Sequence, residues 1–166
     1  MGLDFSLYKK KKDMSIDELF NLIDIMSYEE FEKEFELAYG RRAYELVRFL
    51  STKQEETDGY GFLKKDRWDS LIELMRPIGD KLYRISEAFE HECYSDTVSY
   101  PELLFTDEDK KLINEYEIWY DKTFGGEPYL GYEFSVGYMI DFWNAQDIVR
   151  NYLDDPDYDV IMNISY

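Results

Sequence analysis

Alternation of apolar and polar side chains near both ends of the sequence places the strongest constraint on the fold. In residues 2–8, Leu3, Phe5 and Leu7 occupy every second position. Residues 159–166 repeat this period, with apolar or aromatic side chains at positions 160, 162, 164 and 166. Successive side chains of a strand point to opposite faces of a sheet, so each segment predicts a half-buried strand.

Helical signals fill much of the sequence between these two segments. Two capping boxes, in which a Ser is followed three residues later by a Glu, predict helices that begin near Ser15 and Ser27. The second of these helices is expected to be long and to cover residues 27–50. A similar signature predicts a helix over residues 107–124, which Gly125 ends.

An apolar repeat with a period of seven runs through residues 68–89. Its members are Trp68, Leu71, Met75, Ile78, Leu82, Ile85 and Phe89. The flanking positions lack the charged pairs that select a coiled-coil partner, so we expect a helix in the core of the same chain. Pro77 removes a helical hydrogen bond. Because the apolar register is kept across Pro77, we expect a kink there.

Weaker patterns complete the fold prediction. Residues 52–61 and 91–105 are expected to be loops, the second with room for a short strand. Apolar residues alternate again over residues 130–140, which predicts a strand, with a helix over the second half as the alternative. The sum is an α+β fold. Four to five helices pack on a small sheet that includes both terminal strands, within a single globular domain of residues 1–166.

The charge of the chain is strongly one-sided. It has 37 acidic residues against 19 Lys and Arg, which gives a net charge of −18 in 166 residues. Such a field repels nucleic acid and anionic membranes and attracts basic surfaces. We therefore expect no direct binding to nucleic acid or to membranes. The alternative is that the charge only keeps the protein in solution.

A calcium-loop pattern near the end of the sequence fails when its positions are counted. Asp155, Asp157 and Asp159 match the opening of such a loop. The sixth position should be Gly and the twelfth Glu, but Val160 and Tyr166 stand there. We expect an acidic turn rather than a metal site.

His91 and Cys93 come closest to a nucleophilic pair. A spacing of two positions directs them to different faces of a helix, and acidic neighbours such as Glu92 disfavour a thiolate. Cys93 is the only cysteine, which excludes an intrachain disulfide and fits a reducing compartment. No apolar run reaches the length of a membrane span. We expect no catalytic residues, no metal, no cofactor and a cytoplasmic protein.

Acidic side chains gather in three clusters that are candidates for binding a partner. Carboxylates one helical turn apart repel each other, so such rows do not aid folding and favour Lys and Arg side chains of another molecule. Rows of carboxylates also imitate the phosphates of a nucleic-acid backbone. The alternative is a solvated helix face. The candidate residues are Glu29, Glu30, Glu32, Glu34 and Glu36, then Glu87, Glu90, Glu92 and Asp96, and finally Asp154, Asp155 and Asp157.

The opening MGLDFSLYKKKK allows two interpretations. Gly2 with Ser6 fits an N-myristoylation pattern, and the lysines at 9–12 would add a second membrane signal. The apolar side chains of residues 3–7, however, alternate like a strand that the core needs. We therefore expect a strand whose lysines are its solvated end and protect a sheet edge.

Two segments carry a resemblance to known proteins. The start MGLD followed by LYK, and ELAYGRRAYEL at residues 36–46, resemble a group of short phage and prophage proteins of unknown function. That group brings no catalytic residues. Small acidic phage proteins of this kind are similar to inhibitors of host defence, including anti-CRISPR proteins and nucleic-acid mimics. The resemblance implies an anti-defence role in the cytoplasm of a bacterial host.

Charge and resemblance lead to one hypothesis and two alternatives. The hypothesis is a non-enzymatic acidic inhibitor that blocks the basic, nucleic-acid-binding surface of a host defence nuclease complex. One alternative is a small metal-dependent hydrolase or nucleotide-processing enzyme that uses clustered carboxylates. The other is a structural or scaffold module that forms a homodimer.

Overall fold

The structure is a computed structural model that describes residues 3–51, 59–100 and 103–165. Its strands are β1 (Asp4–Lys11), β2 (Glu36–Arg41), β3 (Gly59–Phe62) and β4 (Tyr158–Ser165). Its α-helices are α1 (Ile16–Asn21), α2 (Tyr28–Phe35), α3 (Tyr44–Leu50), α4 (Lys65–Met75), α5 (Leu82–Ser95), α6 (Asp107–Phe124), α7 (Tyr132–Asn144) and α8 (Gln146–Asp154). Short 3-10 helices are η1 (Leu22–Asp24) and η2 (Gly79–Lys81). The α+β class is confirmed, and these ranges hold eight α-helices rather than four or five.

Two compact units make up this chain. The sheet unit comprises Met1–Glu73 and Asp141–Tyr166, and the hairpin unit comprises Leu74–Ile140. The chain passes from one unit to the other within α4 and again within α7. The single domain expected from the length of the chain stays a prediction.

The four strands form one antiparallel sheet in the order β2-β1-β4-β3. β1 and β4 pair from Asp4 opposite Ser165 to Lys11 opposite Tyr158, so strands near both ends of the chain form the centre of the sheet. β2 and β3 form the edges, and neither was predicted from the sequence. The β1–β2 ladder ends at Tyr8, and the lysines beyond it pair with β4.

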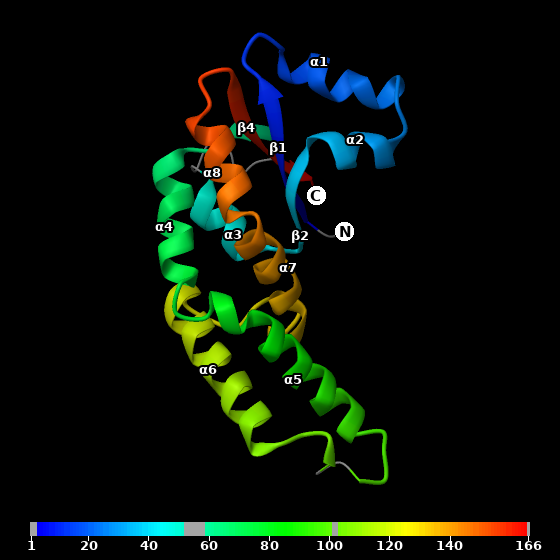
Figure 1. The fold of residues 1–166 in the computed structure, drawn as a ribbon, viewed down its shortest axis with the longest axis vertical. Coiled ribbons are helices and arrows are strands. Elements are labelled where there is room, and N and C mark those ends of the chain that lie inside the picture. Colours follow the sequence, from blue (N-terminus) through cyan, green and yellow to red (C-terminus); the bar gives the residue numbers. More distant parts are fainter. Residues whose placement is uncertain (1–2, 52–58, 101–102, 166) are drawn as a thin grey trace. The chain divides into compact units, whose positions relative to one another are not determined.

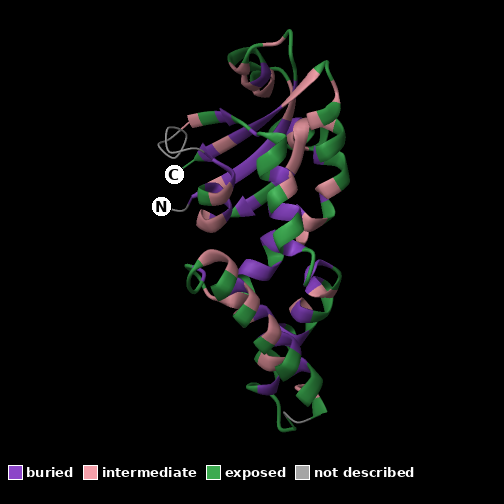
Figure 2. Cartoon of the chain, turned by 90° about the vertical axis from the view of Figure 1, so that its left-hand side faces the viewer, coloured by how far each residue is buried: buried purple, intermediate pink, exposed green. Residues whose placement is uncertain are grey.

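Helices cover both faces of the sheet (Figure 1). On one face, Tyr8 of β1 packs against Phe20 of α1 and Phe31 of α2, each with ring centroids 5.5 Å apart. On the other face, Phe5 of β1 stacks on Phe142 of α7 at 5.7 Å. Figure 2 shows buried residues along the strands, as expected for a sheet between two helical layers.

The lysine run at residues 9–12 is not simply solvated, contrary to the prediction. Lys10 is 4% exposed, and its Nζ donates hydrogen bonds to the backbone carbonyls of Lys11 (2.8 Å) and Met14 (2.6 Å). Its Nζ also lies 3.4 Å from Asp159 Oδ2. A buried ammonium requires such partners because its desolvation is costly. The last two lysines of the run are exposed.

The predicted helix starts are confirmed. Each of the three capping boxes is reciprocal, because the hydroxyl accepts from a backbone N–H and the carboxylate accepts from the cap residue's own N–H. The pairs are Ser15 with Glu18, Ser27 with Glu30, and Thr106 with Asp109. Gly125 ends α6 in the left-handed conformation, with φ 80°.

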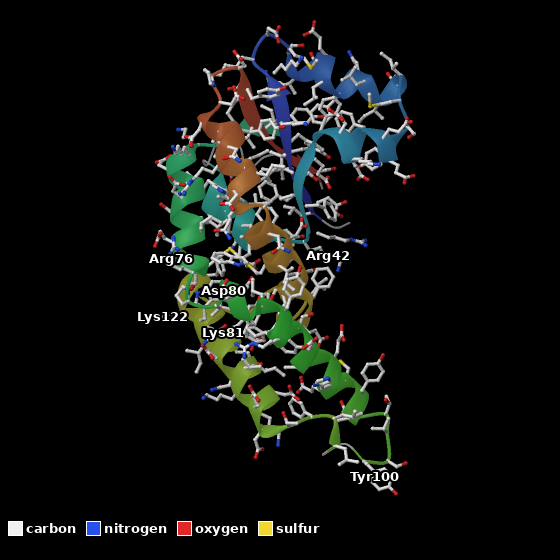
Figure 3. The ribbon with its side chains drawn as sticks, in the orientation of Figure 1. Arg42, Arg76, Asp80, Lys81, Tyr100 and Lys122 are labelled. Atoms are coloured by element: carbon white, nitrogen blue, oxygen red, sulfur yellow. The ribbon has the colours of Figure 1, made fainter. Side chains whose placement is uncertain are left out.

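The long helix predicted over residues 27–50 is wrong in its middle. α2 ends at Phe35 because Glu36 has an extended backbone, with φ −74° and ψ 131°. The chain then pairs with β1 as strand β2, whose ladder hydrogen bonds outweigh the helical spacing of the side chains. Arg42, labelled in Figure 3, takes a left-handed φ of 55° and turns the chain towards α3.

The strand predicted over residues 130–140 is wrong. The alternative of a helix over the second half is confirmed, and α7 begins earlier than that alternative, at Tyr132. Phe134 belongs to the alternating apolar set but is 38% exposed, whereas the polar Ser135 is fully buried. Ser135 Oγ lies 2.6 Å from Tyr116 Oη, which satisfies its hydrogen-bonding capacity. Alternation of side-chain type therefore did not correspond to alternation of burial.

The helix predicted through Pro77 is divided rather than kinked. α4 ends at Met75, and α5 begins at Leu82 after η2. α5 and α6 then lie side by side as a helical hairpin (Figure 1). Phe89 of α5 packs edge-on against Tyr116 of α6, with ring centroids 6.3 Å apart. The heptad-like repeat thus supplies the buried faces of two helices.

Candidate functional site

The three acidic clusters lie on different elements. The first occupies α2 and the first residue of β2, and the third covers the end of α8 and the turn before β4. Both of these belong to the sheet unit. The second cluster lies on α5 in the hairpin unit, where Asp96 is the C-cap residue.

Lysines of the sheet unit partly neutralise the first and third clusters. Lys9 Nζ lies 3.8 Å from Glu34 Oε1, and the same ammonium sits 5.3 Å from the centre of the Tyr152 ring. Lys65 forms an ion pair with Asp154. The local positive charge lowers the attraction of these clusters for a basic partner.

Two residues of the first cluster have structural roles instead. The Glu30 carboxylate accepts hydrogen bonds from Ser27 N (2.9 Å) and Ser27 Oγ (3.0 Å), and these bonds hold the Glu30 pKa below its usual range. Glu36 is half-buried, and its Oε2 has no hydrogen-bond partner among the described residues. Neither side chain is therefore available as a simple surface charge.

Burial is the main reason that the pKa of Glu36 rises to about 7. Hydrogen bonds involving Ser6 and Tyr8 oppose this rise, and the nearby carboxylates of Glu32 and Asp141 add to it. Glu36 is thus a titratable group of the sheet-unit interior rather than a contact residue.

The second cluster lacks neutralising partners of its own. Glu87, Glu90 and Asp96 are exposed and Glu92 is half-buried, and none of the four forms an ion pair within the described ranges. Residues 87–109 contain no Lys or Arg. This cluster is therefore the strongest candidate for contact with a basic partner.

Further carboxylates of the hairpin unit lie near this cluster. Burial raises the pKa of Glu117 of α6, and the charges of Glu92, Asp121 and Glu127 raise it further. Tyr132 Oη donates a hydrogen bond of 2.6 Å to Asp121 Oδ1, and burial together with this bond raises the Tyr132 pKa. Like charges from α5, α6 and the following loop oppose ionisation, so an external cation would relieve their repulsion.

Metal ligation is a separate question from charge. Among residues 3–51, 59–100 and 103–165, no group of three or more His, Cys, Asp or Glu side chains is arranged to hold a metal ion. Asp155 instead stabilises its own turn, since its Oδ1 accepts a hydrogen bond from Asp157 N at 2.9 Å.

An apolar groove of about 710 Å³ runs beside the second acidic cluster. One stripe of α5, the turn before α7 and the first turn of α7 line it, and every lining residue belongs to the hairpin unit. The lining residues are Ser86, Phe89, Glu90, Cys93, Tyr94, Leu130, Glu133 and Phe134. We call this feature the α5 groove. Tyr94 is 61% exposed and Leu130 is 39% exposed, so large apolar surfaces face solvent there.

The loop between α5 and α6 exposes more apolar side chains. Val98, Tyr100 and Leu103 are 42%, 66% and 76% exposed. Figure 3 shows Tyr100 in this loop and Lys81 where α5 begins, at the opposite end of the hairpin. The loop end of the hairpin therefore combines exposed apolar side chains with acidic charge.

Sequence reasoning found Glu90 but missed the other wall of the groove. Leu130, Glu133 and Phe134 were assigned to a strand, which separated them from α5. Leu130 lies in the turn just before α7, and Glu133 and Phe134 lie in the first turn of α7, so a helix start assigned at Tyr132 would have grouped them.

His91 and Cys93 do not form a pair in the structure. His91 Nδ1 lies 3.1 Å from Asp109 Oδ2, which also accepts from Thr106 N at 2.9 Å. Partial burial opposes ionisation of Asp109, but these hydrogen bonds hold its pKa below the usual value. The histidine therefore ties α5 to the cap of α6, while Cys93 lines the α5 groove.

Comparison with known proteins gives no family for this chain. No family model, no curated protein and no solved structure matches it. Within the described ranges, no helix combines the length and the apolar character needed to cross a membrane.

Proposed function

We propose that this protein is a non-enzymatic binding protein whose acidic α5 face occupies a basic surface of another protein. The observation that carries the proposal is the set of α5 carboxylates that form no ion pair with any described residue and lie beside an apolar groove. Charge of one sign steers a basic partner towards this face. Carboxylates then offer paired acceptors to Arg and Lys side chains.

A more specific form of the proposal concerns biological role. The sequence resemblance to phage proteins and the net charge of −18 support a phage-type inhibitor of host defence. Such an inhibitor would act in the cytoplasm of a bacterial host. It would cover the nucleic-acid-binding surface of a defence nuclease complex, much as an anti-CRISPR nucleic-acid mimic does. The metal-dependent hydrolase and the scaffold homodimer stay predictions.

Capture of a partner from a bacterial lysate tests the proposal. The wild-type chain is compared with an α5 variant that carries Glu87→Gln, Glu90→Gln, Glu92→Gln and Asp96→Asn. A control variant removes the same number of charges from the sheet unit through Glu29→Gln, Glu32→Gln, Glu34→Gln and Asp157→Asn. It leaves Glu30 and Glu36 intact because both have structural roles.

The proposal predicts that a nucleic-acid-binding protein is captured by the wild-type chain and by the control variant, but not by the α5 variant. Capture should also weaken steeply as ionic strength rises, because exposed charges are screened. Equal capture by both variants would contradict the assignment of the α5 face. Capture that is insensitive to salt would contradict the electrostatic basis.

A further inference from the structure

The α5 groove has a helical stripe along one wall, and the other wall combines the turn before α7 with the first turn of α7. On α5, the lining residues fall at positions 86, 89, 90, 93 and 94, which is one stripe of a helix. The opposite wall comes from positions 130, 133 and 134. The α5 stripe extends for about 12 Å at the rise of an α-helix, which matches about two turns of a helix laid against it.

Aromatic and aliphatic side chains supply the apolar part of the groove lining. Phe89 lies deep, at 7% exposure, and Phe134 is 38% exposed. Burial of such surfaces against an apolar partner is favourable and has no directional requirement. A groove of about 710 Å³ has room for several Leu, Met or Phe side chains.

The charged residues that line the groove are both acidic. Glu90 of α5 and Glu133 of α7 are exposed, and the lining contains no Lys or Arg. Glu87, one turn before Glu90 on α5, is also exposed. An apolar segment with acidic charge would be repelled here, whereas one flanked by Lys and Arg would find partners on both walls.

We infer that the α5 groove binds a basic amphipathic helix of a partner protein, with its apolar residues in the groove and its Lys and Arg residues on Glu90 and Glu133. Helix-in-groove recognition uses apolar anchors spaced by three and four positions, which fits the stripe that α5 presents along one wall. The hairpin unit offers no strand among its described residues, so pairing of an extended peptide with a sheet edge has no basis there. This inference rests on the proposed function, and it adds that the part of the partner bound at the α5 groove is a helix.

The probe for this binding mode is a synthetic peptide of about four helical turns. It consists of Lys and Leu, with Leu at positions i, i+3, i+4 and i+7. One control peptide has the same composition with its Leu positions scrambled, and a second has Glu in place of Lys. Charge is constant between the first two peptides, so their difference reports the apolar face.

Cys93 supplies a direct readout because it lines the groove and is the only cysteine of the chain. The rate of its modification by a neutral alkylating reagent is measured with and without each peptide. The amphipathic Lys peptide should slow this rate at least about tenfold at saturation, a protection factor expected for a covered thiol. The scrambled peptide and the Glu peptide should leave the rate unchanged.

Substitutions in the groove separate the inference from the proposed function. Leu130→Ser and Phe134→Ser, at partly exposed positions, should each weaken binding of the amphipathic peptide about tenfold. Ile118→Ser, at a position on α6 that is 59% exposed, is the matched control and should not change peptide binding.

Charge substitutions test the acidic residues of the groove. Glu90→Gln and Glu133→Gln should weaken binding of the amphipathic peptide, and Glu108→Gln outside the groove should not. Circular dichroism checks that each variant is folded. Covalent modification of Cys93 obstructs the groove independently of these substitutions and should also weaken binding of the amphipathic peptide.

Each outcome has a distinct meaning. If the scrambled peptide binds as tightly as the amphipathic one and Phe134→Ser behaves like Ile118→Ser, the helix-in-groove assignment is wrong, even where lysate capture still depends on the α5 carboxylates. If the wild-type chain shows twice its mass by native mass spectrometry and Phe134→Ser returns it to a monomer, a second copy occupies the groove. That result would also overturn the assignment.

Discussion

Glu36 and Lys10 are ionisable side chains that the sequence places in acidic and basic runs but that the structure places in the interior of the sheet unit. Glu36 begins β2 beside Ser6 and Tyr8, and burial raises its pKa to about 7. Lys10 is buried and bound to two backbone carbonyls. Patterns of charge in the sequence did not identify either role. The surroundings of Glu36 depend on the pairing of β2 with β1, and the Lys10 ammonium combines local carbonyls with Asp159 of β4.

Glu36→Gln should change how stability depends on pH. The pKa of Glu36 is about 7 in the folded state and about 4.5 when unfolded, so its neutral form stabilises the fold below pH 4.5. This contribution is lost as pH rises through 7. The variant, which cannot ionise, should therefore gain stability over the wild-type chain between pH 5 and 8, by roughly 2 kcal/mol. Urea unfolding across this range measures the free energy of unfolding of both proteins. If the two free energies change with pH in the same way, ionisation of Glu36 does not destabilise the fold.

Lys10→Met should destabilise the sheet unit. The substitution keeps the length of the side chain but leaves the carbonyls of Lys11 and Met14 and the carboxylate of Asp159 without their partner. A loss of about 2–3 kcal/mol is expected in urea unfolding. Lys12→Met, at an exposed position, should change stability by less than about 0.5 kcal/mol. Equal effects of the two substitutions would contradict the partnered role of Lys10.

At the scale of elements, local signals located helix starts well and strands poorly. The capping boxes at Ser15 and Ser27 were readable because each cap involves residues only three apart. β2 was missed because its extended conformation depends on pairing with β1, which is distant in sequence. α7 was taken for a strand because aromatic side chains occupy both its buried and its exposed positions. Because the start of α7 was assigned to a strand, the wall of the α5 groove that α7 contributes was not predicted either.

Thr106→Ala should loosen the start of α6. The hydroxyl of Thr106 accepts a hydrogen bond from Asp109 N at 3.2 Å, and the Asp109 carboxylate accepts one from Thr106 N. Loss of this cap should cost about 1 kcal/mol and should speed amide hydrogen exchange in the first turn of α6. Thr123→Ala in the last turn of α6 is the control and should leave amide hydrogen exchange in the first turn unchanged. Equal protection in both variants would mean that packing alone fixes the helix start.

At the scale of the whole molecule, the net charge of −18 sets both the interactions and the stability of the chain. Repulsion among unpaired carboxylates, including those around Glu117, opposes folding. The same charges underlie the proposed attraction to a basic protein. Composition alone predicted this general tendency, but only the structure distinguishes the partly neutralised clusters of the sheet unit from the unpaired cluster of α5.

Added salt should therefore stabilise the free protein. At neutral pH, raising sodium chloride from about 0.02 to 0.5 M shortens the Debye length from roughly 20 Å to roughly 4 Å and screens the repulsion. The midpoint of thermal unfolding should rise by several degrees. A midpoint that falls with salt would indicate that the ion pairs of the chain outweigh its repulsion.

The central claim is that the α5 face, rather than negative charge in general, recognises a basic partner. The most direct test is the dissociation constant for the captured partner, measured by calorimetry at several salt concentrations for the wild-type chain, the α5 variant and the charge-matched sheet-unit variant. We predict that the α5 variant binds at least about tenfold more weakly and with a flatter salt dependence, while the sheet-unit variant stays close to the wild-type chain. Equal losses of affinity in the two variants would contradict the claim.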